Sequence, residues 1–169
     1  MNDSLEALFK EHYEKILVLA RTRLARERAP ISTLTLAHEL YLNLRERDGL
    51  QFGTREQFLA YSSRAMRSLL VDMARERIAK KRHAELLPLT FGNAVPDGAG
   101  TPEQLVALDE ALTRLGAIDE RLMRVGEMRV IMGMEVGDVA MALGVSEPTI
   151  KRDWQRVKAY LFEALESRA

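Results

Sequence analysis

The stretch from Val136 to Leu165 constrains the fold of this chain more than any other. Its first part has apolar residues at positions i, i+3, i+4 and i+7, which lie on one face of a helix: Val136, Val139, Ala140 and Leu143. Gly144 suits the left-handed position after a helix end, Ser146 suits the N-cap of a following helix, and Pro148 is tolerated in a first helical turn. The pattern predicts two helices joined by a tight turn, with the small Ala140 where they cross.

The second helix of this pair is predicted to have two chemically different faces. Its apolar side is formed by Ile150, Trp154, Val157 and Leu161. The opposite side carries Arg152, Gln155 and Arg156, with Lys151 on the flank. A helix that reads DNA packs its apolar side into the domain and presents basic and amide side chains to the major groove. The segment therefore predicts a helix-turn-helix that binds DNA.

Charge is distributed unevenly along the chain. The 25 basic and 25 acidic residues cancel overall. Residues 1–85 carry 16 Lys and Arg against 12 Asp and Glu, a net charge of +4, whereas residues 86–169 carry 9 against 13, a net charge of −4. From Arg64 to Arg82 there are seven basic residues and only two acidic ones. Because neutralised phosphates supply most non-specific DNA affinity, a neutral chain should bind free DNA weakly and needs a partner that contributes further DNA contacts.

Helical periodicity in the rest of the chain predicts an all-α fold. The expected helices span about residues 4–28, 33 or 35 to 47, 54–82, 102–115, 119–131, 135–143 and 147–166. Residues 86–100 are rich in Pro and Gly and lack a helical period, which is typical of a linker. We expect two helical domains, residues 1–85 and 101–169, joined by this flexible linker.

Several classes of protein are disfavoured. The chain has no run of about 18 apolar residues and no signal peptide pattern, so we expect no membrane association. The absence of cysteine excludes disulfides and thiolate metal sites and fits a cytoplasmic location. No nucleophile–base pair, phosphate-binding loop or metal-ligand spacing stands out. We therefore expect a protein that is not an enzyme and that has no metal and no cofactor.

Three segments, in this order, are similar to a known family. Residues 37–44 (AHELYLNL), 64–75 (RAMRSLLVDMAR) and 146–154 (SEPTIKRDW) resemble regions 2.2, 2.3–2.4 and 4.2 of the extracytoplasmic-function (ECF) sigma factors of bacterial RNA polymerase. The resemblance implies promoter recognition together with core RNA polymerase, bound through its largest and second-largest subunits. It also accounts for the neutral charge, because the polymerase would supply most of the DNA affinity.

The resemblance implies a role for each segment. Region 4.2 would read the duplex −35 element through Thr149, Lys151, Arg152, Gln155 and Arg156. Regions 2.3 and 2.4 would melt the −10 element and hold its single strand through basic side chains: Arg64, Arg67, Arg75, Arg77, Lys80, Lys81 and Arg82. Region 2.2 would dock on the largest polymerase subunit through Leu36, Glu39, Leu40, Leu42 and Asn43.

One segment departs from the family pattern. Many ECF sigma factors have acidic residues just before the region 2.2 helix, whereas this chain has the sequence Ser32, Thr33, Leu34, Thr35. Phosphorylation would add about −1.5 to −2 charge near a helix N-terminus, where anions are favoured. We predict that a Ser/Thr kinase activates the protein at Thr33, Thr35 or Ser32. A plain N-cap role for these threonines and control by an anti-sigma factor remain open alternatives.

Other interpretations fit parts of the sequence. A stand-alone helix-turn-helix regulator, with the N-terminal half as a sensor or dimerisation domain, would contain the same DNA-binding motif. The basic residues from Arg64 to Arg82 could form an ordinary solvated helix face. Phe58, Tyr61 and Met66 could offer surfaces to unstacked bases, although the spacing of Phe58 and Tyr61 favours the core. Core positions are also expected for Trp154 and for four methionines: Met128, Met132, Met134 and Met141.

Overall fold

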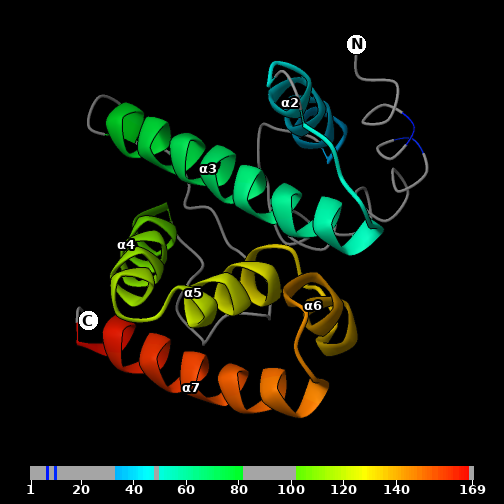
Figure 1. Ribbon diagram of the computed structural model, residues 1–169. Coiled ribbons are helices and arrows are strands. Elements are labelled where there is room, and N and C mark those ends of the chain that lie inside the picture. The colour runs from blue at the N-terminus through cyan, green and yellow to red at the C-terminus, as the bar shows by residue number, and fades with distance from the viewer. Residues whose placement is uncertain (1–6, 8–9, 11–32, 48–49, 82–101, 168–169) are drawn as a thin grey trace.

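The computed structural model describes residues 7, 10, 33–47, 50–81 and 102–167, and these form helices without any strand (Figure 1). The helices are α2 (Thr33–Arg45), α3 (Arg55–Lys81), α4 (Pro102–Ile118), α5 (Glu120–Gly126), α6 (Val136–Leu143) and α7 (Glu147–Glu166). A π-helical turn, η1 (Glu127–Ile131), continues α5. The all-α prediction is confirmed. Apart from the helical residues 7 and 10, the helix expected at 4–28 lies outside the described residues, and so does the linker expected at 86–100.

Helix α3 begins where the sequence predicted a helix, and Thr54 and Gln57 cap its first turn. The backbone N–H of Gln57 donates to Thr54 Oγ1 at 3.2 Å, and Gln57 Oε1 accepts from the N–H of Gly53 at 3.0 Å. The first bond satisfies one N–H group that the start of a helix leaves without an intrahelical partner, and the second holds the residue just before the cap. Thr54 and Gln57 therefore fix the first turn of a 27-residue helix.

The helix-turn-helix forms at the predicted residues. Gly144 has φ of 66°, the left-handed conformation that ends α6, and the N–H of Val145 donates to the carbonyl of Ala140 at 3.1 Å. Ser146 caps α7 by accepting from the N–H of Thr149 at 3.4 Å. Because the turn is held by these local bonds, the relative direction of α6 and α7 follows largely from the sequence of the turn.

The core of the C-terminal helices brings α4, α5 and α7 close together at Gly126. A Cβ atom on Gly126 would lie 2.8 Å from Leu112 Cδ2 and 3.1 Å from Val157 Cγ1. Both of those side chains are fully buried. Only glycine, which has no side chain, fits this contact between three helices.

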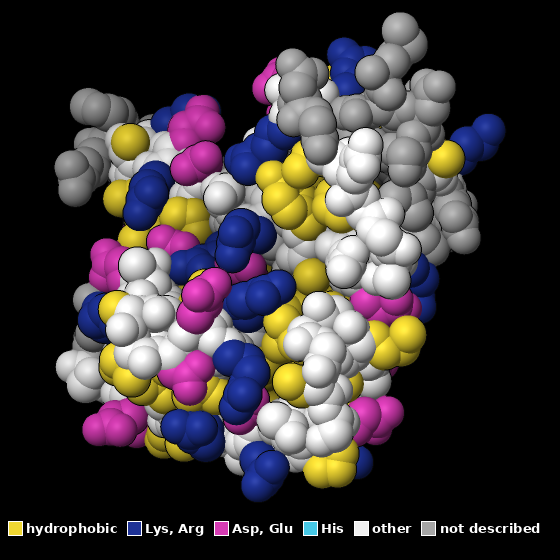
Figure 2. Space-filling view, in the orientation of Figure 1, with side chains coloured by type: hydrophobic (Ala, Val, Ile, Leu, Met, Phe, Trp, Pro, Cys, Tyr) yellow, Lys and Arg dark blue, Asp and Glu magenta, His cyan; other side chains and the backbone are white. Residues whose placement is uncertain are grey.

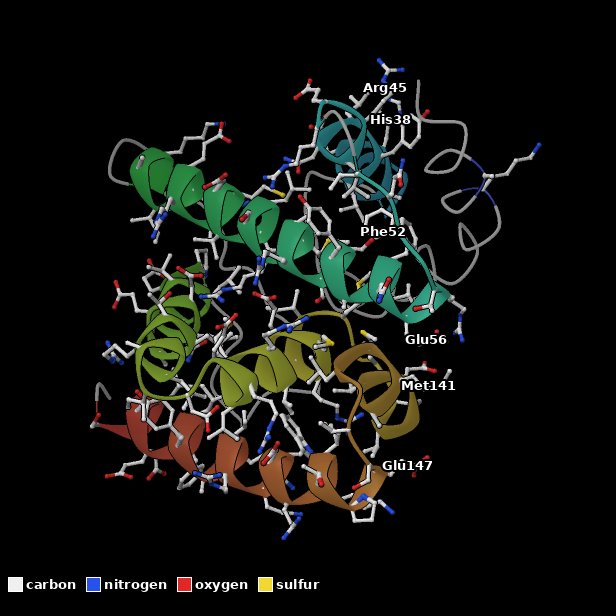
Figure 3. All side chains as sticks on the ribbon, viewed as in Figure 1. His38, Arg45, Phe52, Glu56, Met141 and Glu147 are labelled. Atoms are coloured by element: carbon white, nitrogen blue, oxygen red, sulfur yellow. The ribbon has the colours of Figure 1, made fainter. Side chains whose placement is uncertain are left out.

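Two predicted core residues are placed differently in the structure. Met128, Met132 and Met134 are buried, but Met141 is 66% exposed on the outer side of α6 (Figure 3). Trp154 is only half-buried, and the neighbouring Asp153 is the buried residue at 3% exposure. The core prediction for Met141 was therefore wrong, whereas Trp154 packs against the edge of the core.

Helix α3 is the central element of the described structure. It packs against α2 on one side and against α4, η1 and α6 on the other, as Figure 1 shows. The helices expected to form the second domain thus lie directly against a helix of the expected first domain. Among the described residues, no helix is long and apolar enough to cross a membrane.

Candidate nucleic-acid interface

The exposed face of α7 is the first candidate surface. Four of its five predicted −35 contacts are solvent-exposed: Lys151, Arg152, Gln155 and Arg156. The fifth, Thr149, is half-buried, and its hydroxyl lies 2.9 Å from the hydroxyl of Ser146 at the N-cap. On the other side of the helix, Ile150 and Val157 are fully buried. The amphipathic sequence therefore gives α7 an apolar side that packs into the core and a basic side that is exposed to solvent.

An ion pair between the exposed Arg121 and the buried Asp153 anchors α7 on the side away from the basic face. Arg121 of α5 donates through Nε to Asp153 Oδ2 at 2.8 Å and through Nη2 to Asp153 Oδ1 at 3.4 Å. The bond to this carboxylate raises the pKa of the Arg121 guanidinium. A buried carboxylate needs such a partner because removal from water disfavours its charge. The sequence argument missed this role of Asp153, and an acidic residue within the basic stretch from Lys151 to Lys158 was the available signal.

Trp154 holds basic side chains beside the same anchor. The guanidinium of Arg129 lies 5.1 Å from the centre of its ring, and Lys158 Nζ lies 5.7 Å from it. Both distances are within the range of cation–π attraction. Arg129 and Lys158 thus cover the indole, which accounts for its partial burial without a role in base stacking.

The basic side chains of α3 are the second candidate surface. Arg64, Arg75 and Lys80 are exposed and Arg77 is half-buried. Lys80 Nζ lies 2.7 Å from Glu76 Oε1, and this bond lowers the pKa of the Glu76 carboxyl. The side chain of Lys81 and the whole of Arg82 lie outside the described residues. Arg67 differs from its neighbours, because it is turned toward α4 and η1 and only 12% of its side chain is exposed.

Aromatic side chains line a cavity beside the N-terminal half of α3. Phe52 makes an edge contact with Phe58, with ring centres 5.5 Å apart, and a tilted contact with Tyr61 at 5.6 Å. The cavity of about 440 Å³ is bordered by Phe52, Tyr61 and Arg64, and from the other side by Arg124 and Glu127. Phe58 and Met66 are buried, so of the three predicted base-stacking residues only Tyr61 reaches this cavity. Phe52 was not anticipated, although it lies near the capped start of α3.

Helix α2 carries the residues predicted to dock on the polymerase. Glu39 is exposed, Leu42 and Asn43 are half-buried, and Leu40 is fully buried. Leu40 therefore packs inside the protein in this conformation. Nothing is described for the side chains of Leu36, Thr33 and Thr35 or for Ser32, although the backbone of α2 does begin at Thr33.

A comparison with protein families shows which family has this arrangement of sequence segments. The family model described as ECF sigma factor matches residues 2–167, almost the whole chain. The chain belongs to the ECF sigma factor family. No curated protein sequence matches it, and no solved structure does.

Membership of the ECF sigma factor family fits the two basic helices. ECF sigma factors are DNA-binding factors of transcription initiation that work with core RNA polymerase and often with anti-sigma factors. This is a family of regulatory factors and not of enzymes. Within the described part of this ECF sigma factor, no group of His, Cys, Asp or Glu side chains could hold a metal ion.

Proposed function

We propose that this ECF sigma factor directs core RNA polymerase to alternative promoters. A domain of residues 1–85 would take the melted −10 strand along α3 and dock on the polymerase through α2, and a domain of residues 101–169 would read the −35 duplex through α7. The observation that carries the proposal is the exposed basic and amide face of α7, held over buried Ile150 and Val157 in a chain that matches the family along its length.

The proposal predicts a strict dependence on the polymerase. In vitro transcription should yield a promoter-specific transcript when core RNA polymerase and this chain are both present. With the chain alone, footprinting on the same promoter should show little protection at low micromolar concentration. Strong, two-fold symmetric protection without polymerase would instead identify a stand-alone helix-turn-helix regulator, because such regulators usually bind as dimers.

We further propose that phosphorylation before region 2.2 activates the protein. The first turn of α2 contains no acidic residue, and it starts at Thr33. A phosphate on Thr33, Thr35 or Ser32 would lie near the positive end of the helix dipole and would supply the negative charge for a basic polymerase surface. The partner that this proposal requires is a Ser/Thr kinase.

The test of phosphorylation compares two substituted proteins with a matched control. The Thr33→Glu, Thr35→Glu double variant should support transcription by core polymerase in the absence of kinase. The Thr33→Ala, Thr35→Ala double variant should stay inactive under inducing conditions. Ser167→Ala, at the exposed end of α7, removes a hydroxyl elsewhere and should behave as the parent. The idea fails if the double alanine protein activates promoters as well as the parent does under every inducing condition.

A further inference from the structure

Arg67 of α3 has every donor of its guanidinium engaged by the C-terminal helices. Nε donates to Asp109 Oδ1 at 2.7 Å, and Nη1 contacts Glu127 Oε2 at 3.0 Å and Met123 Sδ at 3.6 Å. Nη2 donates to the carbonyl oxygen of Asp109 and to Thr113 Oγ1, both at 2.9 Å. A guanidinium has five N–H groups, so none is left for another ligand in this conformation.

The same two carboxylates attract the neighbouring arginines of α3. Arg64 Nε lies 3.8 Å from Glu127 Oε1, and Arg75 Nη2 lies 3.8 Å from Asp109 Oδ2. Arg64, Arg67 and Arg75 are spaced i, i+3 and i+11, which places them on one face of the helix. We call these three residues the arginine stripe. Figure 2 shows Lys and Arg side chains interleaved with Asp and Glu side chains across the middle of the molecule.

The acidic side of this contact is built into the fold. Glu127 is 4% exposed and begins the π-helical turn η1, and only 20% of the side chain of Asp109 is exposed. A charge so far removed from water is stable only with a well-formed partner. Asp109 and Glu127 therefore form a preorganised acceptor for the arginine stripe. A further ion pair, Arg55 to Asp138 at 3.7 Å, joins the start of α3 to α6.

We infer that Asp109 and Glu127 form an intramolecular docking surface for α3, which closes the free protein and covers Arg67, the central residue of the arginine stripe, until promoter DNA or polymerase displaces it. Carboxylates and phosphates both bind a guanidinium through its N–H groups, so the two carboxylates compete with DNA for the N–H groups of Arg67. The opposite net charges of residues 1–85 and 86–169 favour this closure over long range. The inference rests on the proposed function only for the identity of the displacing ligand.

Closure lowers the apparent affinity of α3 for DNA by a simple factor. If only a fraction of molecules is open, the observed dissociation constant is the intrinsic one divided by that fraction. Weakening the closed contact should therefore tighten binding even though no DNA contact is added. This outcome distinguishes a covered site from one that is merely surrounded by acidic residues.

The conformational test uses the absence of cysteine from the chain. Ser68→Cys on α3 and Ala117→Cys on α4 replace exposed residues, so two spin labels attach only there. Asp109→Asn, Glu127→Gln should change a narrow distance distribution into a broad one shifted to longer distances. Glu163→Gln, Glu166→Gln on the exposed surface of α7 makes the same change in net charge and should leave the distribution narrow. An unchanged distribution in the Asp109, Glu127 protein overturns the inference.

The binding test measures affinity for a single-stranded oligonucleotide with the −10 sequence by fluorescence anisotropy. The Asp109→Asn, Glu127→Gln protein should bind about threefold to tenfold more tightly than the Glu163→Gln, Glu166→Gln protein, as expected if only 10–30% of molecules are open. Equal affinity overturns the inference. Circular dichroism establishes folding, and Asp109→Asn alone, at the less buried carboxylate, should give a smaller change in the same direction.

The two proposals fail in different ways. If the parent chain produces no transcript with core polymerase while the label distances respond as expected, the proposed function is wrong and the closed contact stands. If the parent chain transcribes but neither distances nor oligonucleotide affinity respond, the proposed function stands and the closed contact has no regulatory effect.

Discussion

Helices α3 and α7 carry similar basic side chains, but their basic faces meet different surroundings. The basic face of α7 is exposed at Lys151, Arg152 and Arg156. On α3, Arg67 is largely enclosed by contacts with Asp109 and Glu127, and Arg64 and Arg75 lie near the same carboxylates. Basic charge on an amphipathic helix predicts affinity for phosphate. Whether those basic side chains are available to a phosphate depends on which other helices pack against them.

The largest expected effect concerns the close packing of helices at Gly126, which supports the position of α7. Gly126→Ala should destabilise the fold by about 3 kcal/mol, the upper end for overpacking, because the added methyl group would contact buried Leu112 and Val157. Thermal unfolding monitored by circular dichroism measures the loss. Gly116→Ala is the matched control, because its methyl group would approach only the flexible side chain of Met123 and alanine favours a helix. Equal melting temperatures for the two variants would contradict the close contact at Gly126.

The next effect tests the open face of α7. Arg152→Ala should weaken binding of the polymerase complex to a −35 duplex by roughly 1–3 kcal/mol if the side chain contacts a base edge. Lys158→Ala removes one positive charge from the same helix at Trp154, at a residue outside the five predicted −35 contacts, and should cost less. Competition with duplexes altered at single −35 positions would show a loss of specificity only for Arg152→Ala. If both variants bind and discriminate alike, the reading face has been assigned to the wrong side of α7.

A smaller effect tests the exposed part of the arginine stripe. Arg75 is 58% exposed and only 3.8 Å from its nearest carboxylate oxygen, so its substitution should disturb the closed contact little. Arg75→Ala should reduce the slope of log affinity against log salt for a −10 single strand by about 0.7, the loss of one phosphate contact. Anisotropy titrations at several salt concentrations give this slope. An unchanged slope would remove Arg75 from the proposed −10 surface.

The smallest effect concerns the exposed pair of Glu76 and Lys80. The pKa of Glu76 is lowered in the folded protein, first by its hydrogen bond to Lys80 and then by the charge of Lys80. The pair therefore stabilises the fold above the pKa of Glu76 in the unfolded chain, and this contribution disappears as pH falls through the lowered, folded value. Glu76→Gln should melt slightly below the parent at pH 7, and the two melting temperatures should converge once the pH falls below the lowered pKa of Glu76. A difference that persists at low pH would indicate another role for Glu76.

Local features of the fold were predictable because their causes are local. Gly144, Ser146 and the Thr54–Gln57 pair end or begin helices through bonds to residues three to five positions away, and Gly144 and Ser146 act at the turn that the sequence predicted. The basic face of α7 was predictable for the same reason, since the helical period decides which side chains share a face. The π-helical turn η1 was not predicted, because nothing in its sequence distinguishes it from a continuation of α5.

The placement of Arg67, Asp153 and Met141 could not be predicted from periodicity. Arg67 meets Asp109 and Glu127, which lie 42 and 60 residues further along the chain, so their contact depends on how α3 packs against α4 and η1. Asp153 is buried because Arg121 of another helix reaches it. Met141 is exposed at 66% because α6 buries only its Val139 and Ala140 side.

The sequence by itself determined the all-α fold class, the helix-turn-helix and the ECF sigma factor family, because capping residues, helical period and motif order act over short distances. Only the tertiary structure decided which basic side chains are free to meet a ligand. Burial and ion pairing arise between segments that are distant in sequence, and the packing of α3 against the C-terminal helices leaves α7 open while it covers Arg67.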